Sequence, residues 1–298
     1  MSLTYDPILG LVLPPNLSEA WGDAIRQNLS VLAAAGAASN CYFVSPAFTD
    51  EALHNAGATG RRHFPTIQAA LDAIATGSGL GHRPTVFVYP HEWAENLVVA
   101  KTCGLVAFGG RCGQALGAGR GVSLIGANAQ SPLITINPPN SDALSFTVEG
   151  FHLENRYAGT ASVINNAQIL KVTGQSLFGA NPNYIGLKDC AIRAQTWGLN
   201  NDWFAALWLA GWNSLYMEDC TLRALNYSGG ASPANGGIAH PIVAQGDVSN
   251  GKAATVRIVS SRIAQNYSGS FALTNALFYL DGGASLQVTG CPGLLRQR

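Results

Sequence analysis

The chain has 298 residues, and its 17 basic side chains balance its 17 acidic ones, so its net charge near neutral pH is zero. A neutral chain is a poor partner for nucleic acid or for an anionic membrane surface, and we expect neither as its main partner. Only 11% of the residues are charged. This low fraction of charged residues predicts that other subunits cover part of the surface.

The first 40 residues are expected to form an arm separate from the rest of the chain. Residues 1–6 have neither a basic n-region nor an apolar h-region, so we expect no secretion signal, and no apolar run in the chain approaches the roughly 18 residues of a membrane span. An apolar extended strip at 6–16 precedes Ser18, which can cap a helix with a 4-4-3 apolar spacing at Trp21, Ile25, Leu29 and Leu32. The small residues at 33–39 are expected to form a flexible joint that separates this helix from the β domain. We therefore expect the apolar seam of the helix, formed by these four residues, to be buried against copies of itself or against a docking partner.

Residues 41–298 are expected to form one elongated β domain. A first strand at 41–45 is followed by a helix at 66–74 with one apolar face, made by Ile67, Ala70, Leu71 and Ile74. Strand-like segments come next at 85–90, 95–100, 104–108 and 122–126. A single amphipathic helix placed before the strands fits a lid on the open end of a strand stack, where backbone groups would otherwise be unpaired.

Five later stretches share one pattern, and their central residues are Phe151, Cys190, Cys220, Ser261 and Cys291. Each has inward-type positions two apart, a step of three across a mostly polar dipeptide, and two more inward-type positions two apart. Period two indicates a strand with one buried face, and the extra residue indicates a bend. Because the pattern returns every 30 to 41 residues with loop-like segments between, it predicts a parallel β-helix, with a β-sandwich as the alternative.

The six cysteines are expected to be thiols. Cys190, Cys220 and Cys291 occupy the same corner of the repeat, where a small buried side chain fits a tight bend. Cys103 and Cys112 have no second metal-binding pair near them, and the six histidines show no ligand spacing. We therefore expect no metal and no cofactor.

The opening of the β domain resembles the pectin lyase-like superfamily, pectin methylesterases in particular. The resemblance lies in residues 64–74, 85–90, 95–99, 122–126 and 148–155. It implies a right-handed parallel β-helix. The family's two catalytic aspartates do not carry over, because the matching positions read Gln195-Thr196-Trp197 in one coil and Thr-Leu-Arg-Ala-Leu-Asn at 221–226 in the next. The expected protein is therefore not an esterase of this type.

Two other groups of residues are candidates for a site. Asp189 and Asp219 precede equivalent corner cysteines and are the obvious pair of carboxylates for glycoside hydrolysis. A solvated ladder of charges explains the same residues better, since Lys188, Glu218, Arg193 and Arg223 lie nearby. An aromatic segment is the candidate surface for binding a glycan, although burial or a subunit interface explains it about as well; its members are Trp197, Asp202, Trp203, Trp208 and Trp212.

The N-terminal arm resembles a short segment of many tailed-phage virion proteins. Residues 10–16 carry a Leu-Pro strip, and residues 21–28 carry a Trp-Gly helix with a later Asn. With residues 42–50 and a β-helix, the resemblance implies a non-catalytic tail fibre, tailspike or capsid decoration protein. It would be a homotrimer made in the host cytoplasm, attached to other virion proteins by residues 1–40, and able to contact host surface polysaccharide. The alternative is a phage-borne depolymerase or a cellular carbohydrate-active enzyme on the same scaffold.

Overall fold

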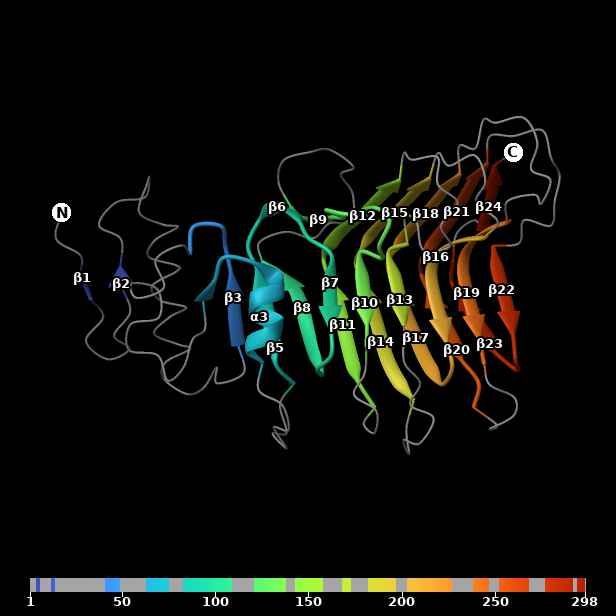
Figure 1. The fold of residues 1–298 in the computed structure, drawn as a ribbon, viewed down its shortest axis with the longest axis horizontal. Helices are drawn as coiled ribbons and strands as arrows, with labels where there is room; N and C mark the ends of the chain where they lie inside the picture. The colour runs from blue at the N-terminus through green and yellow to red at the C-terminus, as the bar shows by residue number, and fades with distance from the viewer. Residues whose placement is uncertain are drawn as a thin grey trace.

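The structure is a computed structural model that describes residues 4–5, 12–13, 41–48, 63–74, 83–108, 121–137, 143–157, 168–172, 182–196, 203–226, 238–246, 252–267, 277–291 and 294–297 (Figure 1). In the arm it describes an antiparallel pair, β1 (Thr4–Tyr5) with β2 (Val12–Leu13). The predicted arm helix, with Trp21, Ile25, Leu29 and Leu32, lies outside the described residues.

Three parallel sheets make up the described part of the β domain. The nine-stranded sheet contains β4 (His63–Phe64), β3 (Cys41–Val44), β5 (Thr85–Val88), β8 (Cys103–Ala107), β11 (Ser145–Glu149), β14 (Asn183–Lys188), β17 (Asn213–Glu218), β20 (Thr255–Val259) and β23 (Ser285–Thr289). The seven-stranded sheet contains β6 (His91–Ala94), β9 (Val122–Ile125), β12 (Phe151–Tyr157), β15 (Ala191–Thr196), β18 (Thr221–Asn226), β21 (Arg262–Tyr267) and β24 (Leu294–Gln297). The six-stranded sheet contains β7 (Leu97–Val99), β10 (Ile134–Ile136), β13 (Leu170–Val172), β16 (Trp203–Ala210), β19 (Ile238–Gln245) and β22 (Phe278–Asp281).

From β8 onward the chain visits the nine-, seven- and six-stranded sheets in a fixed rotation. Each visit adds a strand beside the one laid down in the previous round, so the sheets grow together along the long axis in Figure 1. The prediction of an all-β chain of parallel strands is confirmed. The segments between the corner repeats were expected to be loop-like, and this was wrong in part, because they contain the strands of the six-stranded sheet.

Helix α3 (Ile67–Ala73) is where the second apolar pattern predicted a helix. Its N-terminus is held at two points. The Thr66 hydroxyl accepts a hydrogen bond from the Ala69 N–H at 3.2 Å, and the Glu95 carboxylate accepts from the N–H groups of Ile67 and Gln68, each at 3.0 Å. These bonds satisfy donors that have no partner inside a helix. Ile67, Ala70 and Leu71 are buried, and the helix packs against β3, β4, β5 and β7.

The corner of each repeat is a residue in the left-handed region, directly before the inward corner side chain. These residues are Gly150, Asp189, Asp219, Ser260 and Gly290, with φ between 49° and 79°. The N–H of each of the first four donates to a carbonyl of the following coil at 3.0 to 3.2 Å. The left-handed residue absorbs the extra position in the pattern, so the strands on both sides of it face inward.

One buried cluster runs through the stack from Tyr42 to Ile263. The fifth repeat departs from the prediction at its first strand. Val288 is in register with Ile258, which is fully buried, yet Val288 is 37% exposed. β23 is the outermost strand of its sheet in the described part of the chain, so no described strand of that sheet lies on its outer side to cover Val288. Among the described residues, no helix is long and apolar enough to cross a membrane.

Candidate functional site

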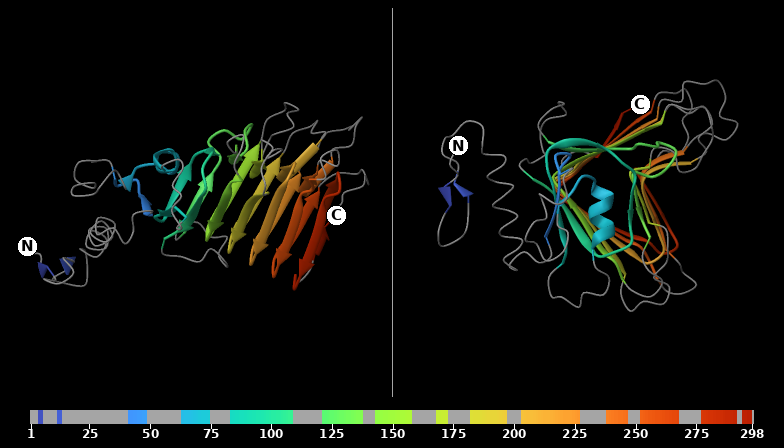
Figure 2. Two further views of the ribbon diagram at one scale, coloured as in Figure 1. Left: turned by 90° about the horizontal axis from the view of Figure 1, so that it is seen from below. Right: turned by 60° about the vertical axis from the view of Figure 1, so that its left-hand side comes forward.

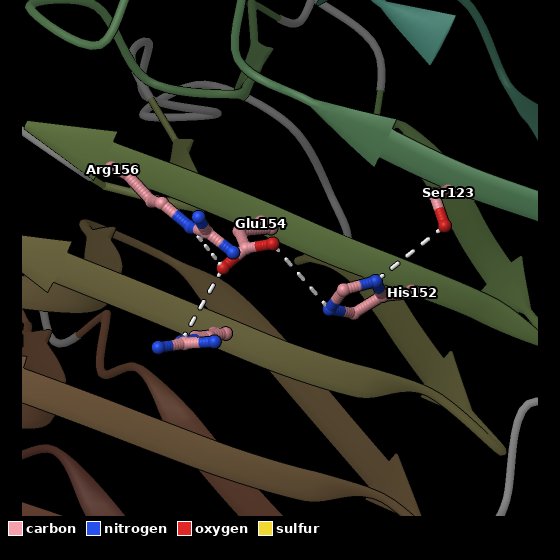
Figure 3. Close-up of polar contacts among 5 residues, drawn as sticks. Ser123, His152, Glu154 and Arg156 are labelled. Carbon is pink, nitrogen blue, oxygen red and sulfur yellow. Dashed lines mark hydrogen bonds and ion pairs between the residues drawn. The ribbon is translucent and has the colours of Figure 1, made fainter. Parts of the chain in front are cut away.

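A buried carboxylate lies on the outward face of the seven-stranded sheet (Figure 3). Side chains along a strand alternate between two faces, so β12 places His152, Glu154 and Arg156 outward while Leu153 faces the core. The parallel register sets Ser123 of β9 opposite His152, and Arg193 of β15 opposite Glu154. We call these five residues, Ser123, His152, Glu154, Arg156 and Arg193, the Glu154 cluster.

Glu154 is the centre of the cluster, and its side chain is only 3% exposed. Its Oε1 accepts a hydrogen bond from Arg156 Nε, and Arg193 Nε lies 3.3 Å from the same oxygen. His152 Nε2 lies 3.9 Å from Oε2, and His152 Nδ1 lies 3.5 Å from the Ser123 hydroxyl. A buried carboxylate is costly unless it is paired and hydrogen-bonded, and the two guanidinium groups meet that need.

The cluster also sets the protonation of its members. Burial lowers the pKa of His152 below its ordinary value, and the neighbouring Glu154 carboxylate opposes this shift without reversing it. The hydrogen bond to Glu154 raises the pKa of Arg156. At neutral pH the cluster therefore holds two guanidinium cations and a neutral imidazole.

Ser123, His152 and Glu154 are the residue types of a nucleophilic triad, but their geometry does not favour that role. A base usually lies about 2.6–3.2 Å from its nucleophile, whereas the hydrogen bond between Ser123 and His152 is 3.5 Å long, and His152 lies 3.9 Å from Glu154, the group that would orient it. The Glu154 carboxylate is also engaged by arginines and is not a dedicated partner of His152. The arrangement is suited to holding charge at a fixed place on the sheet.

The aromatic residues predicted to bind a glycan are only partly described. Trp208 lies on β16 opposite Lys171 of β13, whose Nζ is 5.8 Å from the ring centroid. Trp212 lies after β16, and Lys252 Nζ is 4.9 Å from its ring. Each ring therefore has its own lysine, in a cation–π contact. Trp203 belongs to β16 through its backbone, and Trp197 and Asp202 lie outside the described residues.

Asp189 and Asp219 occupy corner positions with φ of 52° and 51°. Aspartate tolerates the left-handed conformation better than most residues, so the bend itself accounts for the pair. The outward residues beside them form a column of alternating charge, because the register sets Glu149 opposite Lys188 and Lys188 opposite Glu218. Both observations favour a structural role over a catalytic pair.

The corner cysteines are also part of the bend. The thiols of Cys190 and Cys220 each donate to the carbonyl two residues earlier at 3.2 Å, and burial raises the pKa of Cys190. At the equivalent corner the Ser261 hydroxyl makes the same bond at 2.8 Å. Cys103, Cys190, Cys220 and Cys291 carry free thiols. Within the described ranges, no group of three His, Cys, Asp or Glu side chains is placed to hold a metal ion.

The Glu154 cluster is not identified from the sequence, although its three residues on β12 follow a regular alternation. His152, Glu154 and Arg156 alternate with inward residues and on their own suggest an ordinary solvated strand face. Comparison with known proteins adds no further assignment, since no protein-family model, no curated protein and no solved structure matches this chain.

Proposed function

We propose that this chain is a non-catalytic structural protein of a bacteriophage particle, a tail fibre, tailspike or head-decoration subunit. In this proposal the three sheets close into a right-handed parallel β-helix, and α3 is the lid on its first coil. The fixed rotation of the chain among the sheets supports the closed coil. The packing of α3 against β3, β4, β5 and β7 supports the lid, and the right-hand view of Figure 2 places α3 among the sheets at that end.

The observation that carries the proposal is the uninterrupted corner ladder. Every corner from Gly150 to Gly290 has a residue in the left-handed conformation, and Asp189 and Asp219, the best candidates for a catalytic pair, are two of these residues. Each coil buries its apolar face only against its neighbours, so such a stack makes a long, stiff rod. A rod that repeats one structural device is suited to displaying a surface away from a particle.

The attachment part of the proposal comes from the sequence. The arm at 1–40 has an apolar seam and resembles a segment of phage virion proteins. In this proposal it binds other virion proteins and holds three copies of the chain together as a homotrimer. Low overall charge supports side-by-side packing of the rods. Two exposed apolar side chains on different sheets support it as well, Val98 at 50% and Tyr184 at 39% exposure.

Incorporation into particles tests this proposal. The full chain should assemble into particles produced without their own copy of it, and light scattering should give the mass of a trimer. Removal of residues 1–38 should leave a folded β domain that no longer incorporates. Normal incorporation of the truncated chain would mean that the sheets, not the arm, dock to the particle.

The alternative of a polysaccharide depolymerase is tested separately. We expect no release of reducing ends from a panel of glycans by the full chain. Turnover that is abolished by Asp189→Asn together with Asp219→Asn would make the chain a depolymerase and would overturn the non-catalytic assignment.

A further inference from the structure

The outward face of the seven-stranded sheet repeats one sign of charge from coil to coil. The register sets Arg193 of β15 directly opposite Arg223 of β18, and the next strand, β21, carries Arg262 opposite Thr221. The inward neighbours Leu222 and Ile263 are fully buried, so Arg223 and Arg262 share the outward face. Adjacent strands lie about 4.8 Å apart, so Arg193 and Arg223 are close neighbours, while Arg262 is displaced from Arg223 by two residues along β21.

Stability alone does not favour such a row. Like charges directly opposite each other on neighbouring strands are destabilising, and opposite charges are stabilising. The nine-stranded sheet of the same stack follows that rule, with Glu149, Lys188 and Glu218 in successive coils. The seven-stranded sheet breaks it at Arg193 and Arg223. A local rule broken without a structural gain is typical of a functional surface.

The described residues around this row neutralise only part of its charge. Glu154 forms ion pairs with Arg156 and Arg193. Arg223 and Arg262 are exposed, and no described residue forms an ion pair with either of them. Glu92 of β6 lies at the far end of this face, beside Ser123. Among the described residues on this face from Glu154 to Arg262, there are four guanidinium groups and one carboxylate.

The surroundings of the row also limit what can bind there. Small side chains lie beside the arginines on the outward face, Ala191 and Thr221 next to Arg193 and Arg223, and Ala264 next to Arg262. A ligand can therefore lie flat across several coils and meet one cation in each. Guanidinium groups bind carboxylates through two parallel hydrogen bonds, so the matching ligand is a linear polymer with repeated carboxylates.

We infer that the arginine row Arg193, Arg223 and Arg262 is a binding surface for an acidic polysaccharide, with Glu154 as the residue that holds Arg193 in place. The zero net charge of the chain favours a glycan over nucleic acid, which depends on a wider basic surface. This inference deepens the proposed function by naming the class of host glycan. The test below uses the purified full chain, so glycan binding and particle incorporation can fail separately.

Binding of the full chain to immobilised polysaccharides tests the inference by biolayer interferometry. Polysialic acid and hyaluronate are the acidic probes, dextran is the neutral control, and double-stranded DNA is the competing polyanion. We expect the acidic glycans to bind, with an affinity that falls as salt rises. Arg223→Gln combined with Arg262→Gln should weaken this binding at least tenfold. Arg257→Gln, an exposed arginine beside Tyr216 on the nine-stranded sheet, is the matched control and should bind as the parent does.

Four results would overturn the inference. They are failure of the full chain to bind either acidic glycan, equal binding to dextran, DNA binding as tight as glycan binding, and equal losses in the double variant and the Arg257 control. Circular dichroism of each variant must match the parent, because these exposed substitutions leave the core untouched.

Discussion

Leu222 gives the sharpest test of the inward ladder. Its side chain is fully buried on β18, between Ile192 and Ile263 of the adjoining strands. Leu222→Ala removes about 1.5–3 kcal/mol of transfer free energy and leaves a cavity, so the expected loss in unfolding free energy is about 2–5 kcal/mol. Arg223 follows on the same strand but is exposed, and Arg223→Ala should change stability by no more than about 0.5 kcal/mol.

Urea unfolding followed by far-ultraviolet circular dichroism measures both effects. Most domains are stable by only about 5–15 kcal/mol, so the Leu222 variant should show a clearly lower midpoint. The stability of a stack is shared among neighbouring coils, so its transition should also broaden. Leu222→Asp should be more severe, because it buries an unpaired carboxylate. Equal tolerance of the Leu222 and Arg223 substitutions would refute the assignment of faces.

Three further predictions follow from the corners and the buried groups. At Asp219, whose φ is 51°, valine should cost about 1–3 kcal/mol in a thermal melt and glycine should be close to neutral; equal effects would exclude a left-handed corner. Burial lowers the pKa of His152 below 6.5, so the unfolded chain binds this proton more readily and the free energy of unfolding should fall as pH drops below 6.5; an unchanged slope in His152→Asn would contradict this. Burial raises the pKa of Cys103 to about 12, so mass spectrometry should find Cys291 but not Cys103 alkylated by iodoacetamide in the native chain, and equal rates would be a contradiction.

The inward ladder could be predicted because period two and a repeated step of three are local properties of the sequence. The left-handed corners could also have been predicted from the sequence. Gly150 and Gly290 stand where other repeats have Asp189, Asp219 and Ser260, and glycine at one position of a repeat indicates a positive φ. The exposure of Val288 could not be predicted, since it depends on whether another strand lies beside β23.

The candidate site was harder to predict than the fold. The burial of Glu154 depends on Arg193, which is 39 residues later and reaches it only through the register of β12 with β15. A local sequence pattern does not show which residues of two such distant strands lie opposite each other. The sequence makes the tryptophans candidates because they are aromatic. In the structure, Trp208 and Trp212 each contact a different lysine.

Electron cryomicroscopy of purified phage particles tests the proposed function most directly. The account predicts an appendage or decoration built from three copies of the chain, with strands stacked about 4.8 Å apart and residues 1–40 at the end that meets the particle. Particles that lack this density, with the chain recovered only from the lysate of the producing cells, would contradict it.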